Sequence, residues 1–91
     1  MRYRYQMPAP LKEQALHLEE FANSGAQCHA RLRNGTVQPG LLISNATAII
    51  AMRGQDELPF AVEDIAELYQ TEEDRSPEQR GSWRFFDEWS V

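Results

Sequence analysis

The sequence lacks most of the features that would assign it to an enzyme or membrane class. Its 91 residues hold one cysteine, Cys28, which argues against a disulfide framework and fits a reducing cytoplasm. No stretch approaches the roughly 18–20 apolar residues of a membrane span. Residues 1–5 lead into no apolar run, so we expect no signal peptide. These absences favour a small cytoplasmic protein.

A catalytic or metal-binding constellation is also missing. Cys28 and His29 are adjacent, so on a strand they point to opposite faces and cannot share a metal ion or form a nucleophile pair. Glu63, Asp64 and Glu67 are close in sequence, but carboxylates on a solvated turn lack the contrasting environments that acid–base catalysis needs. No glycine-rich phosphate loop follows an expected strand. We therefore expect no enzymatic activity, no metal and no cofactor.

What is present is a run of short strands between residues 27 and 70. Gln27 to Arg33 alternates apolar and polar residues, which places Cys28, Ala30 and Leu32 on a buried face. Asn34-Gly35 is a strong hairpin signal. The next expected strand, residues 36–44, contains Pro39 and Gly40, and an interior glycine indicates a bulge or a sharp bend where another backbone approaches.

The rest of this run predicts three more strands. They cover residues 47–53, 58–62 and 65–69, with Glu63-Asp64 as one helical turn before the last. Five short antiparallel strands, the second strongly bent, are typical of an SH3-like or Sm-like barrel. The predicted fold is therefore mainly β, with a helix before a five-stranded barrel over residues 26–70.

The flanks of the barrel complete one expected domain over residues 1–91. Apolar residues at helical spacing predict a helix over residues 11–24 that lays its stripe on the barrel. Residues 71–81 read as an acidic linker, with one capped turn possible at Ser76-Pro77. Residues 82–91 form an aromatic tail, which we expect to dock on this subunit or on a neighbour. Residues 1–6, if extended, could add an edge strand.

Charge is unevenly distributed along the chain, whose formal net charge is −5. Residues 26–54 contain three arginines and no acid, whereas residues 55–70 contain five acids and no Lys or Arg. Basic groups on one barrel face could contact RNA phosphates, and the candidates are His29, Arg31, Arg33 and Arg53. The alternative is that these arginines solubilise the strands or pair with acids across them.

Residues 11–70 resemble the Sm-like superfamily, and within it the bacterial Hfq-like branch. The resemblance rests on the helix before the strands, on Arg31-Leu32-Arg33-Asn34-Gly35 and Gly40-Leu41-Leu42, and on Leu58-Pro59-Phe60 through Ile65. It implies ring-shaped oligomers that bind RNA near a pore. The acidic pair Glu63-Asp64 stands where that branch carries basic residues, so no pore residue is carried over. A more distant resemblance is to the acidic Rho-binding antiterminator type.

Two functional hypotheses follow. The first is a non-catalytic oligomeric module, an RNA-associated adaptor that binds single-stranded RNA weakly. The second is an acidic module that binds a basic protein partner without RNA contact. A chain of this size buries only about 60–65% of its unfolded surface, which favours self-association. The candidate partner or oligomer interface residues are Tyr3, Tyr5, Glu63, Asp64, Trp83, Phe85, Phe86 and Trp89.

Overall fold

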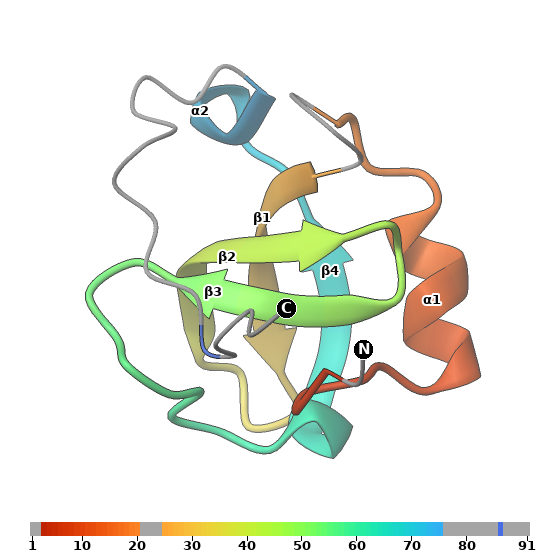
Figure 1. Cartoon of the computed structure of the whole chain (residues 1–91). Helices are drawn as coiled ribbons and strands as arrows, with labels where there is room; N and C mark the ends of the chain where they lie inside the picture. Colours follow the sequence, from red (N-terminus) through yellow and green to blue (C-terminus); the bar gives the residue numbers. More distant parts are fainter. Residues whose placement is uncertain (1–2, 21–24, 76–85, 87–91) are drawn as a thin grey trace.

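The protein is mainly β, and its structure is a computed structural model that describes residues 3–20, 25–75 and 86. One antiparallel sheet has the strand order β3-β2-β1-β4 (Figure 1). Its elements, in chain order, are α1 (Ala9–Ala15), β1 (Gly25–Leu32), β2 (Val37–Ser44), β3 (Ala48–Met52), the 3₁₀ helix η1 (Val62–Asp64), β4 (Ile65–Tyr69) and α2 (Glu72–Arg75). β1 pairs with both β2 and β4 and so forms the centre of the sheet.

The predicted inward face of β1 is confirmed. Cys28, Ala30 and Leu32 are buried in the main core together with residues of β2, β3, β4 and α1. A smaller apolar cluster on β2 and β3 contains Leu42 and Ile50 and packs against Tyr3. Because successive side chains of a strand alternate between faces, Gln27, His29 and Arg31 lie on the opposite face of β1 from Cys28. This second face positions the site described below.

The β1–β2 hairpin is confirmed, but its turn is not a two-residue type I′ turn. Gly35 has φ +90°, its N–H donates to the Leu32 carbonyl at 2.9 Å, and Leu32 N–H donates to the Thr36 carbonyl at 2.8 Å. This is the three-residue hairpin with glycine at the left-handed position. The two-residue turn lies instead between β2 and β3, where Asn45 and Ala46 have φ +50° and +54°.

The bulge predicted at Pro39-Gly40 is confirmed. The β1–β2 register shifts between Cys28 and Ala30, so that His29 faces both Pro39 and Gly40. Gly40 has φ +72°, and its carbonyl accepts a 2.9 Å hydrogen bond from Arg53 N–H. A Cβ atom added at Gly40 would lie 3.2 Å from Arg53 Cβ. Glycine is therefore required both by the backbone conformation and by the approach of Arg53.

The predicted five-stranded closed barrel is wrong, because the sheet has four strands and does not close. Residues 58–62 form no strand, although Leu58 and Val62 are buried. The outer edge of β3 is already occupied: Ile49 N–H donates to the Tyr5 carbonyl and Met7 N–H to the Thr47 carbonyl, both at 3.0 Å. Pro59 also has no N–H for a ladder. The N-terminal segment thus supplies the edge pairing, as an isolated bridge between Gln6 and Ala48.

The helical segments also differ from their predicted bounds. α1 ends at Ala15, followed by a turn in which Leu16 is 72% exposed, so it is shorter than the predicted helix over residues 11–24. The Gln70 amide holds the chain after α1 by accepting from Glu19 N–H and donating to the Glu19 carbonyl, at 2.8 and 2.9 Å. Part of the predicted linker over residues 71–81 is the helical turn α2, whereas the turn predicted at Ser76-Pro77 lies outside the described residues.

Candidate functional site

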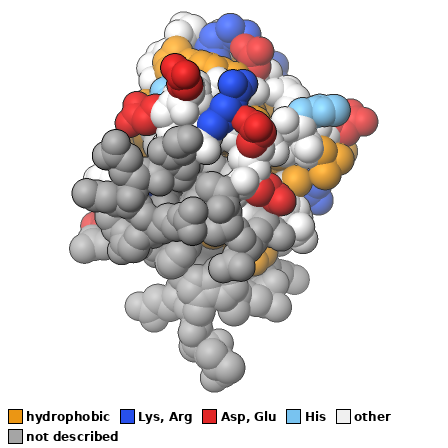
Figure 2. All heavy atoms as spheres, turned by 90° about the horizontal axis from the view of Figure 1, so that it is seen from above, with side chains coloured by type: hydrophobic (Ala, Val, Ile, Leu, Met, Phe, Trp, Pro, Cys, Tyr) orange, Lys and Arg blue, Asp and Glu red, His pale blue; other side chains and the backbone are white. Residues whose placement is uncertain are grey.

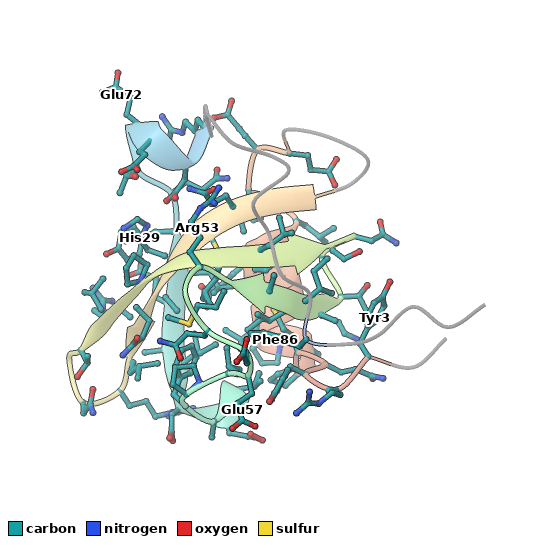
Figure 3. All side chains as sticks on the ribbon, turned by 60° about the vertical axis from the view of Figure 1, so that its left-hand side comes forward. Tyr3, His29, Arg53, Glu57, Glu72 and Phe86 are labelled. Carbon is teal, nitrogen blue, oxygen red and sulfur yellow. The ribbon has the colours of Figure 1, made fainter. Side chains whose placement is uncertain are left out.

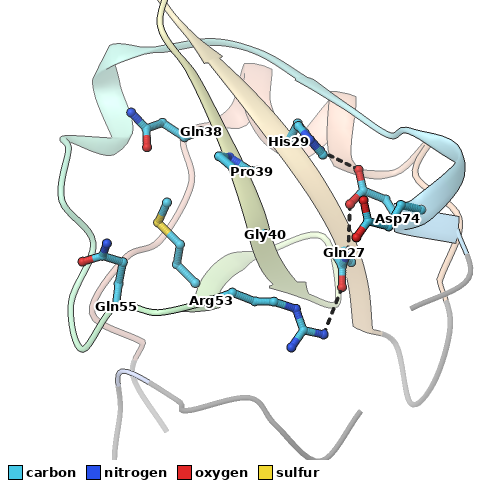
Figure 4. Close-up of a pocket in the computed structure, with 10 residues that line it drawn as sticks. Gln27, His29, Gln38, Pro39, Gly40, Arg53, Gln55 and Asp74 are labelled. Atoms are coloured by element: carbon cyan, nitrogen blue, oxygen red, sulfur yellow. Dashed lines mark hydrogen bonds and ion pairs between the residues drawn. The ribbon is translucent and has the colours of Figure 1, made fainter. Parts of the chain in front are cut away.

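A pocket of about 410 Å³ opens between the bulge of β2, the end of β3 and α2 (Figure 4). This volume is within the range of small-ligand sites. The pocket is lined by Gln27, His29, Gln38, Pro39, Gly40, Met52, Arg53, Gln55, Glu73 and Asp74. Four different elements or their adjoining turns contribute to it, so the sheet and α2 together fix its shape. We call it the β1–α2 pocket.

The buried carboxylate of Asp74 organises one wall of the β1–α2 pocket. Its side chain is 1% exposed. Asp74 Oδ1 accepts a 2.9 Å hydrogen bond from Gln27 Nε2, and Asp74 Oδ2 lies 2.7 Å from His29 Nδ1. Oδ2 also accepts from the N–H and hydroxyl of Thr71, at 2.9 and 3.3 Å. Since a buried charge is tolerated only when it is hydrogen-bonded, this network explains why Asp74 can be buried.

Local sequence places Asp74 in this position. Thr71 precedes α2, and the two residues bond reciprocally: Asp74 N–H donates to the Thr71 hydroxyl at 3.4 Å, while Thr71 N–H donates to Asp74 Oδ2. This is the geometry of a capping box, with Asp in place of the usual Glu or Gln. Burial by itself raises the pKa of Asp74, but hydrogen bonds from Thr71, Gln27 and His29 outweigh it, so the pKa lies below its ordinary value of 3.8.

The ionised Asp74 fixes the tautomer of His29. An ionised carboxylate can only accept hydrogen bonds, so His29 Nδ1 must carry the proton. In the neutral imidazole, Nε2 is then a hydrogen-bond acceptor. The ring also stacks at a tilt of 33° on Tyr69, with centroids 5.4 Å apart. His29 is therefore held in one orientation at the wall of the pocket.

Arg53 lies at the opposite wall and completes a polar chain across the pocket. Its backbone is fixed by the hydrogen bond to Gly40, and its Nη2 lies 3.4 Å from Gln27 Oε1. Gln27 is buried and connects Arg53 to Asp74, which in turn contacts His29 (Figure 4). Figure 3 shows His29 and Arg53 near β1 and β2, with Glu72 pointing away from the sheet on α2.

The pocket joins two of the four predicted RNA-binding residues and separates the other two. His29 and Arg53 line it, whereas Arg31 and Arg33 border other surface hollows. Arg31 Nη2 lies 2.6 Å from Glu67 Oε1, and Arg33 Nε donates to the Glu63 carbonyl at 3.1 Å. Figure 2, which views the molecule from above Figure 1, shows acidic side chains next to basic ones, with no continuous basic face among the residues coloured there.

The interface candidates are placed as follows. Phe86 is buried in the main core, contacts Tyr5 edge-on at 5.1 Å between centroids and donates its N–H to the Ile50 carbonyl at 2.9 Å. Tyr5 also accepts a hydrogen bond from Leu58 N–H, and Tyr3 packs on the smaller cluster. Glu63 and Asp64 are exposed on η1. Trp83, Phe85 and Trp89 lie outside the described residues.

No nucleophilic side chain accompanies the histidine among the residues that line the pocket. The residues lining the pocket include no hydroxyl or thiol. Cys28 is fully buried in the core on the other face of β1, and burial, followed by the negative charge of Asp74, raises the pKa of its thiol. A protonated, inaccessible thiol is a poor nucleophile. Across residues 3–20, 25–75 and 86, no group of three or more His, Cys, Asp or Glu residues could hold a metal ion.

The central residues of this site, Gln27 and Asp74, were not predicted from the sequence. The local signal for Asp74 was the Thr71-x-x-Asp74 spacing, which marks a capped helical turn within the stretch interpreted as a linker. No local signal connects Asp74 to His29, which is 45 residues away. The sequence pattern that could have pointed to Gln27 is its outward position on β1, on the same face of the strand as His29.

Comparison with known proteins leaves the family open. Among the helices that the structure describes, none is long and apolar enough to cross a membrane. The predicted RNA binding and oligomerisation, and the resemblance to the Sm-like superfamily, stay predictions. No protein-family model, curated protein or solved structure matches this chain.

Proposed function

We propose that this protein is a non-catalytic binding module that presents the acidic surface of α2, beside the β1–α2 pocket, to a basic protein partner. The observation that carries the proposal is the imbalance of available charge. The candidate RNA-binding side chains contact acceptors of the chain itself, namely the side chains of Asp74, Glu67 and Gln27 and the carbonyl of Glu63. On α2, Glu72 and Glu73 are exposed and form no ion pair with another described residue.

The excess of negative charge favours a basic protein partner over RNA. RNA binding gains affinity by replacing counterions on phosphates with Lys and Arg, and this gain shrinks for an arginine that is paired with an acid, as Arg31 is with Glu67. A basic protein segment gains instead from the exposed carboxylates, which also raise its rate of encounter. The chain's net charge of −5 acts in the same direction.

The test compares a lysine- and arginine-rich peptide with a single-stranded RNA oligonucleotide, both fluorescently labelled, by anisotropy over a range of salt concentrations. We expect binding of the peptide at low salt and a decrease as salt is added. The double variant Glu72→Gln/Glu73→Gln should weaken binding more than the control Glu13→Gln/Glu20→Gln, which removes the same charge from exposed positions elsewhere. Equal weakening by both variants, or no peptide binding at low salt, would refute the proposal.

Weak binding of single-stranded RNA is the second candidate, favoured by the convergence of His29 and Arg53 on one pocket. In this case the oligonucleotide binds at low salt, and the double variant Arg31→Ala/Arg33→Ala reduces both its affinity and the salt dependence. An oligonucleotide that fails to bind even at low salt rules this candidate out.

A further inference from the structure

We propose that the β1–α2 pocket takes the guanidinium group of an arginine side chain from the basic partner. This inference rests on the proposed function, because it names the side chain that would anchor the partner next to α2.

The charge of the lining favours a cation. Glu73 and Asp74 contribute two negative charges, and Arg53 contributes one positive charge. The Asp74 carboxylate is internally hydrogen-bonded, so it acts mainly through its field, whereas Glu73 is exposed and can contact a ligand directly. A cation is attracted by the exposed carboxylate of Glu73, which forms no ion pair with another described residue.

The available hydrogen-bonding groups include acceptors for a cation. Within the described part of the chain, the side-chain amides of Gln38 and Gln55 have no hydrogen-bond partner, and each offers an accepting oxygen. Glu73 adds a carboxylate. A ligand that suits this set carries several N–H donors, directed to different sides, on one positively charged group.

Guanidinium matches these requirements better than the ammonium group of lysine. It is planar, presents five N–H donors in a fixed fork and is less strongly hydrated, so it loses less on entering a partly enclosed pocket. The flat surface of Pro39 and the Met52 side chain supply apolar contact for a planar group. Arginine is also among the residues that most often anchor protein interfaces.

The experiment compares two short Gly/Ser peptides that carry the same number of positive charges, one with lysines only and one with its central lysine replaced by arginine. We expect the arginine peptide to bind more tightly. Glu73→Gln should lower its affinity roughly fivefold, the upper end for an exposed ion pair. The control is Glu72→Gln, which removes the same charge from the neighbouring residue that does not line the pocket. It should have a smaller effect.

The outcomes separate the two proposals. If both peptides bind equally and both variants weaken them equally, the acidic surface binds basic partners but the guanidinium site is refuted. If neither peptide binds, the proposed function fails, and titration with N-acetyl-arginine amide then decides the guanidinium site by NMR. Shifts of the His29 and Gln38 signals that N-acetyl-lysine amide does not produce would support the site. No shifts at these residues, or equal shifts with both amides, would refute it.

Discussion

Removal of the Asp74 carboxylate should destabilise the fold far more than removal of any exposed acid. In Asp74→Ala, the side chains of Gln27 and His29 and the groups of Thr71 lose their acceptor inside the protein. A hydrogen bond to a charged group contributes about 1.5–3 kcal/mol, and each buried polar group left unsatisfied costs about 1–3 kcal/mol. These contributions overlap, so we expect a total loss of about 3 kcal/mol in the free energy of unfolding at pH 7. Urea unfolding followed by far-UV circular dichroism measures it.

The pH dependence gives an independent check. The pKa of Asp74 is lower in the folded protein than its ordinary value of 3.8, so the ionised form stabilises the fold. This contribution is complete at pH values well above 3.8 and is lost as the pH falls below that value through the folded-state pKa. The stability difference between the wild type and Asp74→Ala should therefore narrow between about pH 5 and pH 2. Glu72→Ala, the exposed control on the same helix, should change stability by no more than about 0.5 kcal/mol. The stabilising role of the Asp74 carboxylate would be refuted if Asp74→Ala lowered the free energy of unfolding at pH 7 by less than about 1 kcal/mol. It would also be refuted if the stability difference from the wild type did not change with pH.

Two backbone positions give further predictions. Ala46→Gly should raise the free energy of unfolding by about 1 kcal/mol, because Ala46 has φ +54°, a left-handed conformation that costs alanine about 1–2 kcal/mol. Its thermal midpoint should rise, and a lower midpoint would contradict this. Gly40→Ala should lower the free energy of unfolding by about 2 kcal/mol, because the new Cβ meets both an unfavourable φ of +72° and Arg53. Urea unfolding measures this loss, and unchanged stability would show that the bulge tolerates a side chain.

Local patterns predicted the features that depend on neighbouring residues. The inward positions of Cys28, Ala30 and Leu32, the bulge at Gly40, the helical turn before β4 and β4 itself all follow from short-range sequence signals. The alternation of apolar and polar residues and the tolerance of glycine for positive φ can be recognised within a few residues of sequence. These predictions therefore needed no knowledge of tertiary packing.

The features that were missed depend on competition between distant segments. Residues 58–62 could have paired with β3, but the N-terminal segment occupies that edge, and no local pattern ranks two such partners. Closure of the barrel failed for the same reason. In the candidate site, the outward position of His29 on β1 was predicted from the sequence, but the helical turn that carries Asp74 was interpreted as a linker. The buried connection from α2 to His29 and Gln27 was therefore not foreseen.

The pairing of β3 with segments from both ends of the sequence has a consequence for synthesis and proteolysis. Tyr5 and Met7 precede β3 in the chain, whereas Phe86, whose N–H donates to the Ile50 carbonyl, follows it and is synthesised later. A nascent chain can therefore form the β1–β2–β3 meander early but must wait for Phe86 before this edge is fully paired. Proteolytic removal of Phe86 would uncover part of an apolar strand, and exposed strand edges promote aggregation.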